Sequence, residues 1–263
     1  MLPFSEFSAP VLARIRVLAT DVDDTLTTNG KIPALVIEGL TSLGQAGVPV
    51  ALVTGRPAGW AQALAGYVSG VRIAVAENGL VAFDGAGARV DLGPERGPDF
   101  FARLAENGAR VREAFQLTVT PDDTFRLFER AFVRPPSFDA RALVASGKLV
   151  DPDFEVVASS IHIHVRPAGW GKAEGLLAAL APIAPAACAA PETSILFVGD
   201  SSNDRPLFAR LRRTSVGVRN VIRYLDELGE DRPAYVTQAE CAEGFGEVAR
   251  ALLAARAAVR RGL

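Results

Sequence analysis

Short apolar runs alternate with stretches of helical spacing in the first part of the chain. A continuous apolar run bounded by turn residues is typical of a strand buried on both faces of a parallel sheet. The alternation returns after Lys172 and continues to a closing amphipathic helix. We therefore predict an α/β fold with a doubly wound parallel sheet, built from residues 1–79 and 168–263. The first predicted strand ends at Thr20, and the others cover residues 48–53, 71–76, 194–198 and 214–218. The predicted helices cover residues 33–46, 58–68, 172–180 and 244–260, and one more begins at Arg205.

The segment between these two parts, residues 80–167, has a different pattern, with many glycine and proline turns. Structureless loops longer than about 12–15 residues are uncommon in compact domains, so this insertion should fold by itself. We predict a small α+β cap. Its expected strands cover residues 117–120, 154–158 and 161–165, and its expected helices cover residues 98–115 and 138–146.

Composition narrows the class of protein. Hydrophobic residues make up 49% of the 263 residues and the formal net charge is -2, which indicates neither disorder nor a surface that binds nucleic acid. Cys188 and Cys241 form no closely spaced pair, so neither a disulfide framework nor a zinc site is expected. The start of the sequence lacks a basic signal region and no apolar run reaches the length of a membrane span, so we expect a cytoplasmic protein without a membrane partner.

Three carboxylates follow the first predicted strand within four residues, as Asp21, Asp23 and Asp24. Such a cluster is electrostatically costly unless a cation or a proton relieves the repulsion. Two acids at alternate positions suit a site where Asp21 attacks a phosphorus atom and Asp23 transfers a proton. The alternative is that these acids only cap or stabilise a turn and have no catalytic role.

Three further segments supply the groups that such a site needs. Thr54, Gly55 and Arg56 follow the strand at 48–53, and a hydroxyl with backbone amides at such a turn can hold phosphate oxygens. Lys172 opens a helix. The strand at 194–198 leads to Asp200, Asn203 and Asp204, whose acids could also be a helix cap and a first-turn acid. Because ligands bind beyond the carboxyl ends of strands where the strand order reverses, we expect these segments to share one pocket.

These four segments resemble, in order and spacing, the four motifs of the haloacid dehalogenase (HAD) superfamily. The insertion between the second and third motifs, preceded by Glu77-Asn78-Gly79, is similar to the Cof-like branch, as in sucrose-phosphate and mannosyl-3-phosphoglycerate phosphatases. The resemblance implies a Rossmann-like core with an inserted α+β cap. It also implies a Mg²⁺-dependent phosphatase that hydrolyses a small phosphorylated metabolite, such as a sugar phosphate or a sugar-acid conjugate, through an aspartyl-phosphate.

The same resemblance implies roles for individual residues. Asp21 would be the nucleophile and Asp23 the general acid and base. The Mg²⁺ ligands would come from Asp21, Asp23 through its backbone carbonyl, and Asp200, while Asp204 would orient metal-bound water or hold Lys172. Thr54, Gly55, Lys172 and Asn203 would bind phosphate, and Arg56, Glu77, Asn78 and His164 are the candidate substrate contacts.

Two features leave alternatives open. Asp24 stands where many relatives have glycine, which suggests an unusual backbone conformation at this residue. His162 and His164 lie two apart on a predicted strand and hence on one face, where they could bind a transition metal or a sugar hydroxyl or serve a structural role.

The function also has alternatives. One is a phosphotransferase or phosphomutase, because residues 21–27 resemble the opening motif of phosphomannomutase. Another is a sensor that binds a phosphorylated metabolite without catalysis. The partner in each case is a small phosphorylated molecule, and either a monomer or a homodimer fits the sequence.

Overall fold

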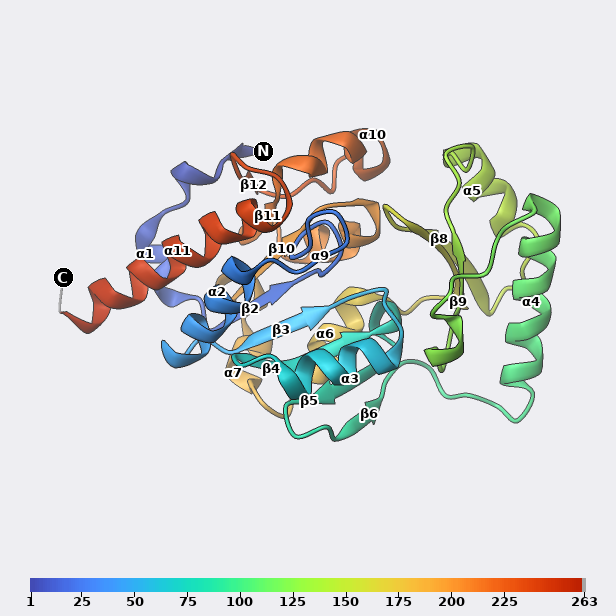
Figure 1. The fold of residues 1–263 in the computed structure, drawn as a ribbon, viewed down its shortest axis with the longest axis horizontal. Coiled ribbons are helices and arrows are strands. Elements are labelled where there is room, and N and C mark those ends of the chain that lie inside the picture. The colour runs from blue at the N-terminus through green and yellow to red at the C-terminus, as the bar shows by residue number, and fades with distance from the viewer. Residues whose placement is uncertain (262–263) are drawn as a thin grey trace.

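The computed structural model describes residues 1–261, in which a large and a small unit lie side by side (Figure 1). The large unit contains a nine-stranded sheet with the order β1-β12-β11-β10-β2-β3-β4-β5-β6. Neighbouring strands from β1 to β4 in this order are parallel, and β5 and β6 are antiparallel additions at one edge. The strands are β1 Leu2–Pro3, β2 Val17–Thr20, β3 Val50–Val53, β4 Val71–Ala76, β5 Val81–Asp84, β6 Arg89–Asp91, β10 Ile195–Gly199, β11 Ser215–Gly217 and β12 Tyr235–Val236.

Strand β2 lies at the point where the strand order reverses. The chain proceeds from β2 to β3 and β4 on one side, whereas β10, β11 and β12 follow one another on the other side. The register pairs Thr20 of β2 with Val198 of β10 and with Leu52 of β3. The predicted doubly wound sheet is therefore confirmed, with the strand before Asp21 near its centre.

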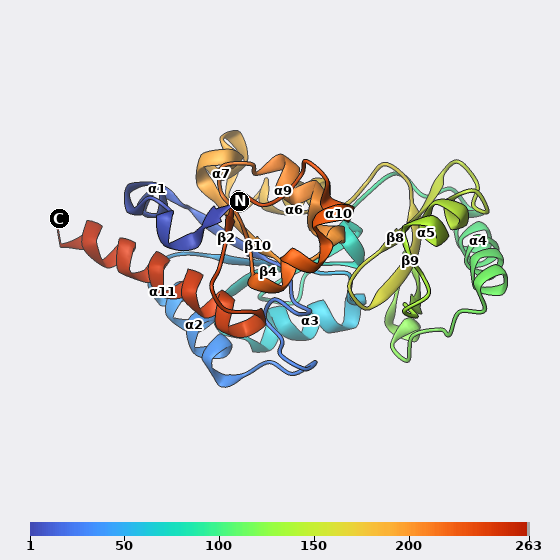
Figure 2. The same cartoon turned by 90° about the horizontal axis from the view of Figure 1, so that it is seen from above.

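Helices cover both faces of the large sheet (Figure 2). On one face lie α1, α2, α3 and α11, and on the other lie α6, α7 and α9, so that two separate apolar clusters form. The helices of the large unit are α1 Ala9–Arg14, α2 Ala34–Gln45, α3 Ala58–Tyr67, α6 Lys172–Leu180, α7 Pro185–Ala189, α8 Pro191–Ser194, α9 Arg205–Arg210, α10 Leu225–Leu228 and α11 Cys241–Arg260. Within residues 1–261 no helix combines the length and the apolar character that crossing a membrane requires.

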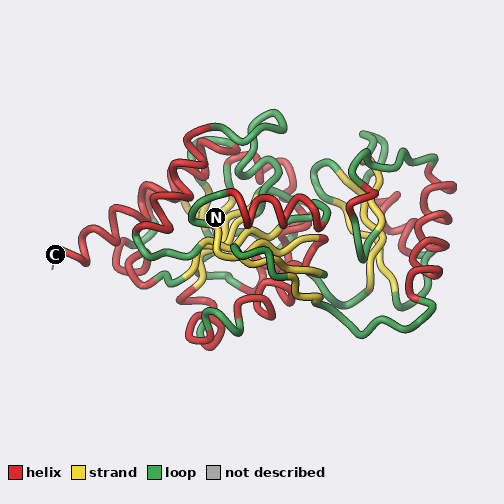
Figure 3. Tube along the Cα trace, turned by 60° about the horizontal axis from the view of Figure 1, so that its bottom comes forward, coloured by secondary structure: helices red, strands yellow, loops and turns green. Residues whose placement is uncertain are grey.

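The small unit is an antiparallel three-stranded sheet with the order β7-β9-β8, covered by two helices. Its elements are α4 Phe100–Phe115, β7 Arg130–Val133, α5 Ala140–Gly147, β8 Phe154–Ala158 and β9 His162–Pro167. The helices pack on the face of the sheet that points away from the large unit (Figures 1 and 3). The other face of the sheet is therefore turned toward the carboxyl ends of the large sheet.

The structure corrects two sequence predictions. Residues 117–120 form only an isolated bridge, between Val119 and Phe132, and the edge strand of the small sheet is β7. Pro121 follows directly and has no N–H group with which to extend a ladder. Residues 81–91, which we placed in the insertion, form β5 and β6 of the large sheet, where their apolar positions cover its edge.

Two glycines allow the chain to cross itself where it leaves the large unit and where it returns. Gly79, with a φ of +110°, lies against helix α6, and a Cβ atom on Gly175 would lie 2.4 Å from the Cα atom of Gly79. Real Cβ contacts are essentially never that short, so neither backbone could accept a side chain without moving. The crossing fixes Lys172, at the start of α6, against the exit segment.

We expect Gly175→Ala to lower the free energy of unfolding by about 1–3 kcal/mol, because the added methyl group would displace the exit segment. Gly66→Ala is the matched control, since Gly66 is also helical and a Cβ there meets nothing within 4 Å. That control should stabilise the fold by about 0.5–1 kcal/mol. Urea unfolding of the two variants tests the crossing, and equal effects in both would contradict it.

Candidate active site

The catalytic candidates lie at the carboxyl ends of β2 and β10. Asp21 follows β2 directly, and its N–H group donates a hydrogen bond of 2.9 Å to the carbonyl of Val198 in β10. Asp200 follows β10 in the same way. Because these strands are adjacent and parallel, residues 179 positions apart in the sequence meet at one edge of the sheet. The expected convergence at the reversal of the strand order is present.

Lys172 is the central cation of this group. Its Nζ atom donates to Asp21 Oδ1 at 2.6 Å and to Asp204 Oδ1 at 2.7 Å, and all three side chains are buried. Burial opposes the charge on the lysine, but the carboxylates of Asp204 and Asp21 outweigh burial and raise the pKa of Lys172. Lys172 therefore stays protonated and holds the nucleophile candidate in place.

Asp21, Asp200 and Asp204 form a buried acidic triad. They offer carboxylate oxygens that all lie within 4.8 Å of one another. Burial raises the pKa of Asp21 to about 8 and raises the pKa of Asp200 well above its ordinary value, because one lysine cannot balance three carboxylates. Clustered carboxylate oxygens are the donors that a hard divalent cation takes, so these residues fit such an ion.

Asp204 and Asp200 are held from several directions. Asp204 Oδ2 accepts the N–H groups of Asp200 at 2.9 Å and Ser201 at 3.3 Å, so this acid both shapes the loop and holds Lys172. Asp200 accepts hydrogen bonds from Thr25 at 3.4 Å and from Asn220 at 3.3 Å. The capping explanation therefore applies to Asp204, which also contacts Lys172, but not to Asp200, whose carboxylate accepts only side-chain donors among the described residues.

Asp23 does not join the triad through its side chain. Its carboxylate is bound by Arg56 in a bidentate contact of 2.8 and 2.7 Å. Arg56 also contacts Asp122 of the small unit at 3.3 Å and stacks over Trp60. We expected Arg56 to contact substrate, and the structure instead places it between an acid of the large unit and an acid of the small unit.

The backbone around Asp23 is also unusual. Asp24 has a φ of +54°, in the left-handed region that favours glycine. An unusual backbone conformation was expected at Asp24, because many relatives have glycine at this position. The N–H group of Asp24 donates to Thr27 Oγ1 at 2.8 Å, and its carbonyl accepts from Asn220 at 3.0 Å. These contacts stabilise the turn that presents Asp23 beside Asp21.

A small enclosed cavity lies between the acids and the small unit. Thr54 is buried beneath this region, where its Oγ1 atom accepts the N–H group of Arg56 at 3.0 Å. Asn203 accepts a hydrogen bond from Ser201 at 2.9 Å. The residues that line the cavity are Asp21, Asp23, Gly55, Ser159, Ser160, His162, His164, Ser201 and Asn203. Most of the predicted phosphate and catalytic residues therefore surround or adjoin one space.

Glu77 and Asn78 belong to the hinge between the units. Both have a positive φ, of 51° and 54°. The Glu77 carboxylate accepts the N–H group of Ala58 at 3.1 Å and those of Leu127 at 2.8 Å and Phe128 at 2.7 Å, so it links the two units. We expected Glu77 to contact substrate, and its oxygens are instead taken up by these backbone donors.

Several residues of the site were not expected from the sequence. Arg126 and Glu129 form a buried ion pair, and Glu129 also accepts Asn78 Nδ2 at 3.0 Å and contacts His164 Nδ1 at 2.9 Å. These two residues lie in an irregular segment before β7 that carries no motif. Asn220 carried a usable signal, because it lies three residues after β11, on the loop that leaves the carboxyl edge beside the one that carries Asp200.

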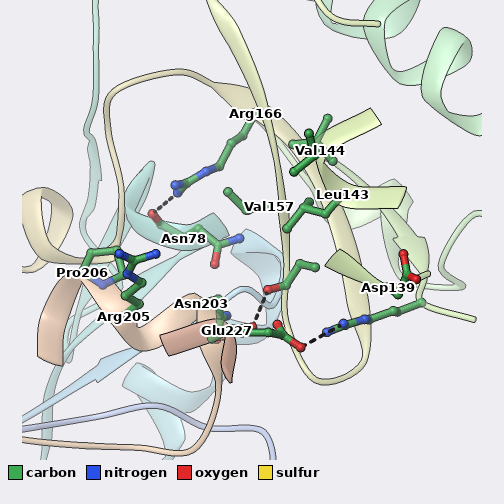
Figure 4. Close-up of a pocket in the computed structure, with 14 residues that line it drawn as sticks. Asn78, Asp139, Leu143, Val144, Val157, Arg166, Asn203, Arg205, Pro206 and Glu227 are labelled. Atoms are coloured by element: carbon green, nitrogen blue, oxygen red, sulfur yellow. Dashed lines mark hydrogen bonds and ion pairs between the residues drawn. The ribbon is translucent and has the colours of Figure 1, made fainter. Parts of the chain in front are cut away.

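A second, larger cavity of about 310 Å³ opens beside the first, between α5 and β8 of the small unit and α9 and α10 of the large unit (Figure 4). Apolar side chains such as Leu143 and Val157 line one side, and Arg166 of the neighbouring strand β9 reaches toward the large unit, where it donates a hydrogen bond of 3.0 Å to the carbonyl of Asn78. Asn203 lines both cavities. This side chain therefore forms part of the wall of both spaces.

The hinge makes stability depend on pH. Burial and the neighbouring Glu129 raise the pKa of Glu77 from 4.5 to about 7. Between these values the folded protein keeps a proton that the unfolded chain has lost, so the free energy of unfolding falls as the pH rises. We expect Glu77→Gln to remove up to about 1.4 kcal/mol of this fall per pH unit.

Urea unfolding at about pH 5 and pH 7 measures this effect of the Glu77 pKa. Glu106→Gln, an exposed change on α4, is the matched control and should keep the wild-type pH dependence. Parallel curves for wild type and Glu77→Gln would show that Glu77 titrates normally.

Comparison with known proteins agrees with this geometry. The family model for haloacid dehalogenase-like hydrolases matches residues 18–90. A phosphoglycolate phosphatase of Aeropyrum pernix is 28% identical over 201 residues, which are 74% of this chain and 78% of the relative. A phosphoglycolate phosphatase of Methanothermobacter thermautotrophicus is 27% identical over 237 residues, covering 90% of this chain and 98% of the relative.

Solved structures share the fold. A Thermoplasma acidophilum protein has a TM-score of 0.70 at 22% identity, covering 90% of this chain and 98% of that one. The sucrose-phosphatase of Synechocystis, solved with sucrose and phosphate, has a TM-score of 0.64 at 18% identity, covering 91% and 98%. The motifs, the sheet order and the matched family model agree: residues 18–90 are similar to the haloacid dehalogenase-like hydrolases, and the whole chain shares the fold of these solved structures.

Proposed function

We propose that this protein is a Mg²⁺-dependent phosphatase that hydrolyses a small phosphorylated metabolite through an aspartyl-phosphate at Asp21. The observation that carries the proposal is the contact of Lys172 with Asp21 and Asp204. Asp200 lies in the same group of acids, and Asp23 follows Asp21 by two residues. This arrangement offers a fixed nucleophile, a second acid and a place for a cation within one enclosed region. The enzyme class is a phosphoric monoester hydrolase, as the names of the phosphatase relatives support.

In the first step, a carboxylate oxygen of Asp21 attacks phosphorus and the bond from phosphorus to the ester oxygen breaks. Asp23 in its protonated form gives its proton to the departing oxygen. In the second step, water attacks the phosphorus, Asp23 takes a proton from that water, and the bond to Asp21 breaks. Two displacements replace one difficult hydrolysis, and Asp21 and Asp23 return to their starting states.

Other side chains hold the charge that these steps redistribute. Lys172 keeps Asp21 oriented and offers positive charge beside the phosphoryl group. Thr54, the Gly55 backbone and Asn203 would bind phosphate oxygens. Arg56 orients the Asp23 carboxylate through two parallel hydrogen bonds, a geometry that adds direction to the contact.

The acidic triad is the proposed Mg²⁺ site. Asp21 and Asp200 would ligate the ion with the backbone carbonyl of Asp23, and Asp204 would support them while holding Lys172. When bound, the ion shields the Asp21 carboxylate from the negative phosphoryl group that it must approach.

The substrate class follows from how little room the closed site leaves. The small unit lies directly over the acids, and serine and histidine side chains close the cavity. Such a site suits a compact leaving group rather than a phosphoprotein. We propose a phosphorylated sugar, sugar acid or related small hydroxylated compound, and the names of the relatives make phosphoglycolate a compound to include in the tests.

Release of phosphate from a panel of sugar phosphates and small phosphoesters tests the proposal. We expect release with Mg²⁺ and its loss with a chelator. Asp21→Asn should lower the rate by a factor on the order of 10⁴, because no covalent intermediate can form. Asp91→Asn, a change at the half-exposed edge strand β6, is the control and should keep wild-type rates. Transfer of phosphate to a sugar acceptor in preference to water would instead establish a phosphotransferase.

Asp23→Asn separates proton transfer from binding. We expect turnover to fall by roughly 10²–10⁴-fold, since general acid-base catalysis contributes about that much. Inorganic phosphate should still bind, because the lysine, threonine and asparagine candidates are unchanged. Calorimetric titration with phosphate measures that affinity. If Asp23→Asn retained full turnover, Asp23 would have no role in proton transfer.

A further inference from the structure

The small unit contributes four side chains to the cavity that faces Asp21. They are Ser159, Ser160, His162 and His164. Burial lowers the pKa of His162 to about 3, so its ring is neutral at neutral pH. Opposite the acids of the large unit, this side of the cavity therefore presents neutral polar groups.

His164 is fully buried, with 0% of its surface exposed. Its Nδ1 atom lies 2.9 Å from Glu129 Oε1. Among residues 1–261, its Nε2 atom has no hydrogen-bond partner. A buried polar atom without a partner is costly, and one that belongs to a residue lining a ligand cavity points to a partner supplied by the ligand.

Glu129 fixes the state of this ring. Burial raises the pKa of Glu129, but the His164 and Arg126 side chains beside it outweigh burial and lower the pKa to about 2. An ionised carboxylate can only accept hydrogen bonds, so the shared proton lies on His164 Nδ1. Burial lowers the pKa of His164 as well, which favours the neutral ring. A neutral ring with its proton on Nδ1 carries a lone pair on Nε2.

The ring lies against the predicted phosphate-binding turn. A Cβ atom on Gly55 would be 3.2 Å from His164 Cε1, the ring carbon next to Nε2. The same cavity is lined by Asp21 and Asp23. A leaving group that extended from a phosphoryl group at Asp21 toward the small unit would therefore pass close to His164.

We propose that His164 Nε2 accepts a hydrogen bond from a hydroxyl group that the leaving group carries close to its ester oxygen. His164 would thereby select hydroxylated phosphate esters over esters that lack this hydroxyl. This inference rests on the proposed phosphatase function and narrows its substrate class.

Three esters that differ at one position test the inference. They are 2-hydroxypropyl phosphate, 2-fluoropropyl phosphate and propyl phosphate. Fluorine is close to a hydroxyl in size but cannot donate a hydrogen bond. For the wild type we expect kcat/KM to be about tenfold higher for the hydroxyl ester than for either of the others, which should be similar to each other.

Two variants connect this preference to one atom. His164→Asn places an amide near the Nδ1 position, where it can still reach Glu129, but removes the Nε2 position. We expect the hydroxyl preference to fall to about one in this variant. His164→Gln places an amide oxygen near the Nε2 position and should restore part of the preference. A purely structural role for His164 would change all three esters alike.

Dissociation constants of the matching propyl phosphonates, whose carbon–phosphorus bond cannot be hydrolysed by this route, separate the two proposals. If no ester is hydrolysed but the hydroxyl phosphonate binds about tenfold more tightly, the phosphatase proposal fails and the hydroxyl contact stands. If the esters are hydrolysed without preference in the wild type, or if the preference persists in His164→Asn, the inference is overturned. The phosphonate series on wild-type protein needs no variant, so a variant that does not fold cannot leave the question open.

Discussion

The contact of one buried lysine with two buried carboxylates organises this protein. Lys172 opens α6, Asp21 ends β2 and Asp204 lies in the loop after β10, so three distant segments must meet for the charges to be paired. Removing either kind of partner would leave an uncompensated charge in the interior, which is far more costly than a broken surface pair. The strand order and the position of α6 against the sheet are therefore constrained by charge as well as by apolar packing.

The buried carboxylates around Lys172 outnumber the single positive charge of the lysine. With Asp200 included, the residues around Lys172 carry more negative than positive charge, and burial raises the pKa of both Asp21 and Asp200. A site that is costly when empty gains most from a bound cation, so the same burial that strains the acids favours the proposed ion. The same few side chains thus contribute to the stability of the fold and form the proposed phosphoryl-transfer site.

The sequence was most informative where a motif followed a buried strand. Strand β4 and strand β8 match their predicted bounds, and Asp21, Asp200 and Asp204 meet at the carboxyl edge, whereas the Asp23 carboxylate turns to Arg56. The sequence was least informative where contacts join segments that have neither a motif nor a regular hydrophobic spacing. Arg56 pairs with Asp23 and Asp122, and Glu129 pairs with Arg126, because folding brings irregular turns together. No local periodicity encodes such pairs, since each depends on how the small unit is placed.

One guanidinium group joins the two units at the proposed catalytic acid. Arg56 contacts Asp23 in the large unit and Asp122 in the small unit, so the orientation of the Asp23 carboxylate and the position of the small unit depend on the same side chain. Any separation of the units would free one side of Arg56 and alter the electrostatic environment of Asp23. The seating of the small unit and the orientation of the Asp23 carboxylate are therefore coupled through one side chain.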